Sequence, residues 1–188
     1  TITVDGVLRE YRLIIPTGYT ASTQYKLIFG WHGYSNTVTA FQNGTLVTPL
    51  RAAAGTQAIF VLPQGIQTLG LPAGASGASD TLPGWDWRPT GRDVLLFDAI
   101  YESVASELCI DLSRVYSFGR SMGAYLSNVL GCARGHLLRA QADEAGAMPD
   151  TMRRYICSSE TIPVWKNHNQ DDMEVPYVYR GVPTFRRW

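Results

Sequence analysis

The segment from Gly119 to Gly123 reads Gly-Arg-Ser-Met-Gly and places Ser121 between two glycines. A β-prone run, Val115 to Phe118, leads into it, and a helix-compatible run, Met122 to Leu130, leads out. A nucleophile elbow requires this order, because its serine sits on a sharp strand-to-helix turn whose backbone leaves no room for side chains at the two glycines. We therefore predict that Ser121 is a nucleophile; the alternative is a serine in an ordinary glycine-rich turn.

A serine hydroxyl is a weak nucleophile near neutral pH, so it needs a histidine that takes its proton and a carboxylate that orients the histidine. Behind an elbow of this kind, the acid and then the histidine follow the serine along the chain. The acid candidates are Asp143, Glu144, Asp150, Glu160, Asp171, Asp172 and Glu174. The acids just past the last expected strand are best placed, because the carboxyl ends of strands carry the functional loops of such sheets. Only His136 and His168 follow Ser121, and neither follows that acid cluster.

The loop that begins at His32-Gly33-Tyr34 comes directly after the apolar run 26–31. A loop at the end of a buried strand can offer a backbone N–H to a developing oxyanion, and Gly33 allows the tight turn that this needs. We interpret His32 as a buried structural histidine that hydrogen-bonds the loop, in preference to a catalytic one.

Two tryptophans, Trp85 and Trp87, follow the Gly-, Ala-, Ser- and Pro-rich stretch 70–84. That stretch has no periodicity and predicts a surface loop. The two rings either line a ligand cleft or cover the edge of the core, and both interpretations stay open at this point.

These groups need strands and helices that bring them together. Continuous apolar runs at 26–31 and 58–62 predict buried strands, and the run 7–15 predicts an edge strand. Strands that alternate with helical segments indicate the α/β class, with a mostly parallel central sheet and helices on both faces. The remaining expected elements are a short helix at 49–54, the strand before Ser121, a short strand or turn at 140–147 and a last strand at 162–166.

The clearest helix runs from Asp93 to Leu108, where apolar residues recur at helical spacing. We interpret Asp93 and Glu102 as cap and solvent residues of this helix. They are therefore not expected to act as catalytic acids.

The composition narrows the class of protein. A length of 188 residues suits one domain, which we assign to residues 1–188. The formal net charge is zero and the charges are interspersed, so neither nucleic acid nor an anionic membrane surface is expected as a partner. The chain has no apolar run of about 18 residues, so we expect no membrane span. Thr1 to Val4 is already strand-like, which fits a mature chain whose signal peptide has been removed.

The chain contains three cysteines, Cys109, Cys132 and Cys157. An odd number suggests one disulfide together with either an absent partner or a buried free thiol, and the spacing does not choose the pairing. No cysteines or histidines stand at metal-ligand spacing, so we expect no metal site and no cofactor.

Several motifs, in the right order over nearly the whole chain, resemble the secreted esterases of carbohydrate esterase family one. They are His32-Gly33, Gly84-Trp85, Asp93-Val94, the run 109–116, the segment around Ser121, and Val164-Trp165 followed by His168, Asp172 and Val175-Pro176. That family joins feruloyl esterases, acetylxylan esterases and polyhydroxybutyrate depolymerase-like enzymes. The resemblance implies an α/β-hydrolase fold and a secreted protein.

The same resemblance assigns site residues. In the family, the last strand leads to a His-Gly-Thr-x-Asp-x-x-Val-Pro motif whose Asp is the triad acid, and that position is Asp172 here. It also implies that the backbone N–H groups of Tyr34 and Met122 form the oxyanion hole. His168 matches a structural histidine of the family.

The chain departs from the family at two places. Asn169-Gln170 replaces the Gly-Thr of the acid motif. The catalytic histidine of the family lies in a further C-terminal segment, and this chain stops at Trp188 before it, so we expect the C-terminal part of the domain to be missing. Trp188 resembles a tryptophan that precedes a cysteine in these esterases, which would account for the odd cysteine count.

The resulting hypothesis is a secreted serine esterase that forms an acyl-enzyme. Its substrates would be feruloyl or acetyl esters of plant polysaccharide, or a related polyester, and Tyr34, Trp85 and Trp87 could stack on a cinnamoyl ring. The alternative is a non-catalytic carbohydrate- or polyester-binding protein on a hydrolase scaffold that lacks its histidine. A peptidase would share the elbow, but nothing in the sequence favours a peptide substrate.

Overall fold

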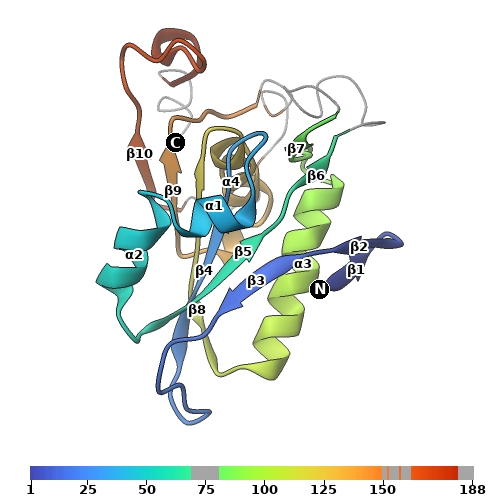
Figure 1. Ribbon diagram of the computed structural model, residues 1–188, viewed down its shortest axis with the longest axis vertical. Helices are drawn as coiled ribbons and strands as arrows, with labels where there is room; N and C mark the ends of the chain where they lie inside the picture. The colour runs from blue at the N-terminus through green and yellow to red at the C-terminus, as the bar shows by residue number, and fades with distance from the viewer. Residues whose placement is uncertain (69–80, 150–151, 153–156, 158–161, 182–188) are drawn as a thin grey trace.

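The computed structural model describes residues 1–68, 81–149, 152, 157 and 162–181. Six strands form one sheet in the order β10-β9-β8-β4-β5-β3 (Figure 1). Every neighbouring pair is parallel except β3 with β5. The strands are β3 (Tyr11–Ile14), β4 (Tyr25–Trp31), β5 (Ala58–Pro63), β8 (Ile110–Arg120), β9 (Ala140–Glu144) and β10 (Val164–Asn167). The predicted α/β class with a mostly parallel sheet is therefore confirmed.

The central strands are buried on both faces, as their continuous apolar sequences predict. All six residues of β5 are buried, and Leu27, Phe29 and Trp31 of β4 are 0% exposed. The predicted edge strand is confirmed in β3, but the run 7–15 is not one strand. Its first part, β2 (Val7–Arg9), leaves the sheet and forms an antiparallel hairpin with β1 (Ile2–Val4).

Helices cover both faces of the sheet. On one face, α3 (Arg92–Glu107) and α4 (Met122–Ala133) share the larger core cluster with Ile59 and Val61 of β5. On the other face, α1 (Val38–Gln42) and α2 (Val47–Ala54) pack around Phe60 and Phe118. Alternate residues of β5 thus belong to opposite cores, which is the period of a strand between two layers. No described helix has the length and apolar character needed to cross a membrane.

Short elements complete the described chain. They are β6 (Ile66–Gln67), β7 (Pro83–Gly84), the 3-10 helix η1 (Gly135–Leu137) and the π-helix η3 (Tyr177–Gly181). β6 pairs with β7, and most of the predicted loop 70–84 between them lies outside the described residues. A disulfide joins Cys132 at the end of α4 to Cys157, and Cys109 is a free, partly buried thiol.

The N-terminal hairpin is attached to α3 by a buried ion pair. Arg9 Nη2 donates to Asp93 Oδ1 over 2.6 Å, and the two side chains are 1% and 0% exposed. The interpretation of Asp93 as the cap residue of this helix is therefore wrong, since the N-cap is Gly91, whereas Glu102 is exposed as expected. The partner of Asp93 lies 84 residues away in the sequence, so helical periodicity could not reveal the pairing.

Asp93→Asn is expected to lower the free energy of unfolding by about 3 kcal/mol or more, because it leaves the Arg9 guanidinium buried without a carboxylate. Glu102→Gln on the exposed side of the same helix is the control and should change it by less than about 0.5 kcal/mol. Urea denaturation followed by circular dichroism measures both. Equal effects of the two substitutions would contradict this assignment.

Candidate active site

Ser121 lies on the sharp turn between β8 and α4. Its φ and ψ are 51° and −120°, a combination that costs a non-glycine residue on the order of 1–3 kcal/mol. Its backbone N–H donates to the carbonyl of Glu144 at the end of β9, over 2.8 Å. The neighbouring strand therefore helps to hold the strained serine in place.

The two glycines beside Ser121 are required by close backbone contacts. A Cβ added at Gly119 would overlap the carbonyl group of Gly123, and one added at Gly123 would overlap the carbonyl group of Trp31. Overlaps with backbone cannot be relieved by a side-chain rotation. The structure thus has the strand-to-helix turn that the sequence predicts, with the start of α4 pressed against the end of β4.

The loop after β4 lies beside Ser121. A Cβ added at Gly33 would be 3.5 Å from the Cβ of Ser121, so the loop that carries the next amide, that of Tyr34, passes close to the serine. On the other side, the first N–H groups to bond the Ser121 carbonyl come from Ala124 and Tyr125, at 2.9 and 3.2 Å. The Met122 N–H therefore stands at the helix start, where no intrahelical acceptor exists. Two such amides near one serine suit the stabilisation of an oxyanion.

His32 is a structural residue of this loop. It is 0% exposed, and its Nε2 accepts from the Gly65 N–H over 2.9 Å. An N–H can only donate, so the ring proton is on Nδ1, which bonds the Gly33 carbonyl over 2.7 Å. Burial lowers the pKa of His32 below its usual value, and the bond to Gly33 opposes this only in part. The ring is thus neutral with both nitrogens engaged.

The other two histidines are also engaged or distant. His136 lies in η1, beyond the far end of α4, and the 12 residues of that helix separate it from Ser121 by about 18 Å. His168 Nε2 donates to the carbonyl of Val175 over 2.7 Å and lies 3.4 Å from Asp172 Oδ2. All three histidines lie in the described ranges, and none of them hydrogen-bonds the Ser121 hydroxyl.

Asp172 follows β10, and its loop lies at the same end of the sheet as the carboxyl ends of β9 and β10 (Figure 1). Its Oδ1 accepts from the N–H groups of Glu174 and Val175, at 3.0 and 2.8 Å. The structure brings Asp172 together with His168, and no described contact joins it to Ser121. Within the described ranges, no three His, Cys, Asp or Glu side chains gather closely enough to hold a metal ion.

The two tryptophans have different surroundings. Trp85 is 0% exposed and donates from Nε1 to the His32 carbonyl over 2.8 Å. Its ring is therefore part of the core, which favours the second of the two interpretations left open by the sequence, that this tryptophan covers the core. Trp87 is 9% exposed and stacks on Tyr125, with ring centroids 4.7 Å apart. Tyr125 is not among the residues predicted from the sequence, although its position four residues after Ser121, on the helix that follows, places it near the serine.

Buried charges hold residues 84–88, the tryptophan loop, in place. The Asp86 N–H donates to Asp93 Oδ2 over 2.6 Å, which links the loop to the ion pair with Arg9. The Asp86 carboxylate, which is 0% exposed, in turn accepts from Arg88 Nε and Nη2 at 2.9 and 2.6 Å. The chain on both sides of Trp87 is thus fixed, and with it the position of the Trp87 ring beside α4.

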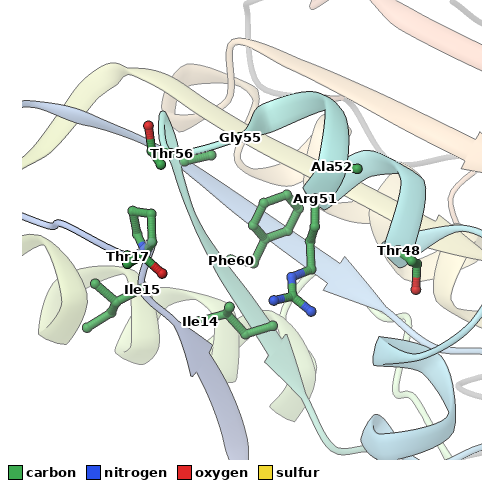
Figure 2. Close-up of a pocket in the computed structure, with 11 residues that line it drawn as sticks. Ile14, Ile15, Thr17, Thr48, Arg51, Ala52, Gly55, Thr56 and Phe60 are labelled. Carbon is green, nitrogen blue, oxygen red and sulfur yellow. The ribbon is translucent and has the colours of Figure 1, made fainter.

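A pocket of about 400 Å³ lies between β3, α2 and the start of β5. Ile14, Phe60 and Arg51 are among the residues that line it (Figure 2). The strand register pairs Lys26 with Ala58, and pairs Trp31, five residues later, with Gly119. Ser121 therefore lies roughly 23 Å from Ala58 along the strands. This pocket belongs to the opposite end of the sheet and is separate from the candidate active site.

No family model matches the chain, but curated relatives and solved structures resemble it. The chain is 37% identical over 143 residues to the probable feruloyl esterase C of Aspergillus terreus and 35% identical over 143 residues to the feruloyl esterase C of Emericella nidulans. These alignments cover 74% of this chain and 47% of each relative, so the chain spans about half of their length. Among solved structures, a CE1 ferulic acid esterase from Anaeromyces mucronatus matches with a TM-score of 0.62 and 19% identity, over 90% of this chain and 69% of that one.

The assignment of His32 predicts a pH dependence of stability. Because its pKa is lowered on folding, the unfolded chain binds the extra proton first as the pH falls. Stability should be fully present above about pH 6.5, the ordinary histidine value, and should decrease below it by at most about 1.4 kcal/mol per pH unit until the folded pKa is reached.

Urea denaturation of the chain at pH 7.5, 6.5 and 5.5, beside His32→Gln and His136→Gln, measures this dependence. His136 is exposed, so its variant should behave like the unmodified chain. His32→Gln should lose the decrease between pH 6.5 and 5.5; an unchanged pH profile in that variant would contradict the assignment.

Proposed function

We propose that Ser121 is the nucleophile of a secreted carboxylic ester hydrolase, because the chain is similar to fungal feruloyl esterases over 143 residues. The observation that carries the proposal is the strained Ser121 backbone between β8 and α4, with the loop at Gly33 beside it. A serine held at such a cost, directly before the Met122 N–H at the start of α4, is difficult to explain by packing alone.

The reaction follows from these positions. The Ser121 Oγ attacks the ester carbonyl carbon, and the carbonyl oxygen becomes an oxyanion that accepts hydrogen bonds from the Tyr34 and Met122 N–H groups. The base takes the Ser121 hydroxyl proton during the attack. Collapse of the tetrahedral intermediate then breaks the ester C–O bond, the base returns the proton to the departing alcohol, and the acyl group stays on Ser121. A water molecule then attacks the acyl-enzyme through the same hole and releases the carboxylic acid.

Asp172 is proposed as the acid that orients the catalytic base. Its Oδ1 is fixed by two backbone N–H groups, which suits a carboxylate with a defined orientation. The base itself is none of His32, His136 and His168, given their partners and distances. We therefore assign the role of base to none of these three histidines.

Esters of aromatic acids are the proposed substrate class. Tyr125 lies about one helical turn after Ser121 on α4, and the Trp87 ring stacks on it. The relatives are named feruloyl esterases, and a feruloyl ester has an aromatic ring that such a pair can contact. We also propose two other kinds of substrate, namely acetyl esters of polysaccharide, and polyesters. Secretion is supported by the disulfide between Cys132 and Cys157, since disulfides persist in oxidising compartments.

A second candidate is a binding protein for polysaccharide or polyester without turnover. It is favoured by one observation, that none of the three histidines, all within the described ranges, hydrogen-bonds the Ser121 hydroxyl. Such a protein would bind xylan or polyester saturably and would leave their ester bonds intact.

The nucleophile is tested with imidazole as an external base. A fluorophosphonate should label Ser121 slowly in the 188-residue chain, and added imidazole should accelerate labelling by about tenfold or more, since a general base contributes on the order of 10²–10⁴. Mass spectrometry of the labelled peptide measures the rate.

Two variants control this experiment. Ser121→Ala should show no labelling with or without imidazole, whereas Ser113→Ala, on an exposed position of β8, should behave like the unmodified chain. Labelling that persists in Ser121→Ala, or a Ser121 that stays unlabelled at high imidazole, would contradict the esterase and favour the binding protein.

The role of Trp87 is tested by ligand binding. Trp87→Leu should weaken the binding of methyl ferulate by about 2- to 10-fold, the range expected for one lost aromatic contact of 0.5–1.5 kcal/mol. Trp165→Leu is the matched control, since Trp165 is 59% exposed on the edge strand β10. Isothermal calorimetry compares both; an unchanged affinity in Trp87→Leu would remove this residue from the substrate site.

A further inference from the structure

A buried cluster of polar side chains lies under the elbow and takes no part in the reaction described above. Lys166 of β10 donates from Nζ to Asp143 Oδ2 of β9 over 3.0 Å. Asn128 of α4 donates to the same oxygen over 2.8 Å. The Lys166 and Asp143 side chains are 1% and 0% exposed. The cluster thus joins three elements at one buried point.

The cluster reaches the nucleophile through the turn that follows β9. Lys166 Nζ also donates to the carbonyl of Gly146 over 2.9 Å. Gly146 lies directly against the start of α4, because an added Cβ would overlap the Ala124 side chain and come within 3.1 Å of the Ser121 carbonyl oxygen. Two residues earlier in the same turn, the Glu144 carbonyl accepts the Ser121 N–H over 2.8 Å.

The turn is itself strained and is held by β10 at a second point. Ala145 has φ 50°, in the left-handed region that a residue with a Cβ rarely adopts. Its N–H donates to the Asn167 carbonyl over 2.9 Å. Two neighbouring residues of β10 therefore hold this turn: Lys166 bonds Gly146, and Asn167 bonds Ala145.

A charged pair at this depth is not explained by stability. Burial raises the pKa of the Asp143 carboxyl, and the Lys166 ammonium opposes that rise only in part. Buried ion pairs are often replaceable by apolar residues without loss of stability, whereas the removal of one partner is costly. What an apolar pair could not supply is the directed hydrogen bond from Nζ to the Gly146 carbonyl.

We propose that Lys166 is a positioning residue that fixes the Glu144–Gly146 turn, and through it the backbone of Ser121, in the reactive conformation. The effect of Lys166 on the reactivity of Ser121 rests on the proposed role of Ser121 as a nucleophile. Its effect on the position of the Ser121 backbone does not rest on that role. Loss of the ammonium should therefore affect Ser121 beyond what any loss of stability explains.

Three variants separate positioning from stability. Lys166→Met leaves the Asp143 carboxylate buried and unpaired, so it should lower the melting temperature. The double variant Lys166→Met/Asp143→Asn removes both charges and should recover most of the lost melting temperature. This variant still lacks the hydrogen bond to the Gly146 carbonyl. Lys26→Met is the matched control, because Lys26 is the only other lysine of the chain and bonds Gln57 at an exposed site.

Each protein is measured for melting temperature, for hydrogen exchange of the Ser121 amide and for fluorophosphonate labelling with imidazole. The double variant should exchange the Ser121 amide about tenfold faster or more and label about 10- to 100-fold more slowly, the range that a misplacement near 1 Å produces. Lys26→Met should match the unmodified chain in all three. If exchange in the double variant stays within about twofold of the unmodified chain, Lys166 is only structural and the proposal is overturned.

Hydrogen exchange and labelling test the positioning role of Lys166 and the esterase function separately. If the unmodified chain is not labelled at all, the proposed esterase function fails, and the exchange of the Ser121 amide still decides whether Lys166 positions the turn. If labelling recovers with the melting temperature in the double variant, the positioning role is overturned while the esterase function stands.

Discussion

The close approach of Gly123 to the carbonyl of Trp31 is the constraint on which the site depends. Because residue 123 has no side chain, α4 can begin directly against the end of β4, and the chain can turn from β8 into α4 within one residue. That residue is Ser121, and its φ of 51° is the cost of the turn. The parallel strands on either side supply the packing that sustains such strain.

The loops around this turn are fixed by hydrogen bonds to one another. The neutral ring of His32 joins the Gly33 carbonyl to the Gly65 N–H, and the His32 carbonyl accepts from Trp85. The buried carboxylates of Asp86 and Asp93 attach the same tryptophan loop to α3. Groups that are tens of residues apart in the sequence therefore meet at the carboxyl ends of the central strands, where preorganised donors can act on a developing charge.

Local patterns predicted much of this arrangement, because strands buried on both faces and a glycine-flanked serine are encoded by neighbouring residues. The order of elements, the edge position of β3 and the turn at Ser121 follow from such patterns. The partners of buried charges do not: Asp93 and Lys166 look like solvent residues until Arg9 and Asp143 are brought to them by the fold. The burial of Trp85 had no local signal either, since its loop is polar and glycine-rich.

The central claim is that Ser121 and two backbone amides form a site for acyl transfer. The most direct test is a crystal structure of the chain after reaction with a phosphonate that mimics the tetrahedral intermediate. The account predicts phosphorus bonded to Ser121 Oγ and one phosphonyl oxygen about 2.7–3.1 Å from both the Tyr34 and the Met122 nitrogens. A phosphonyl oxygen directed away from these amides, or an adduct on another residue, would contradict it.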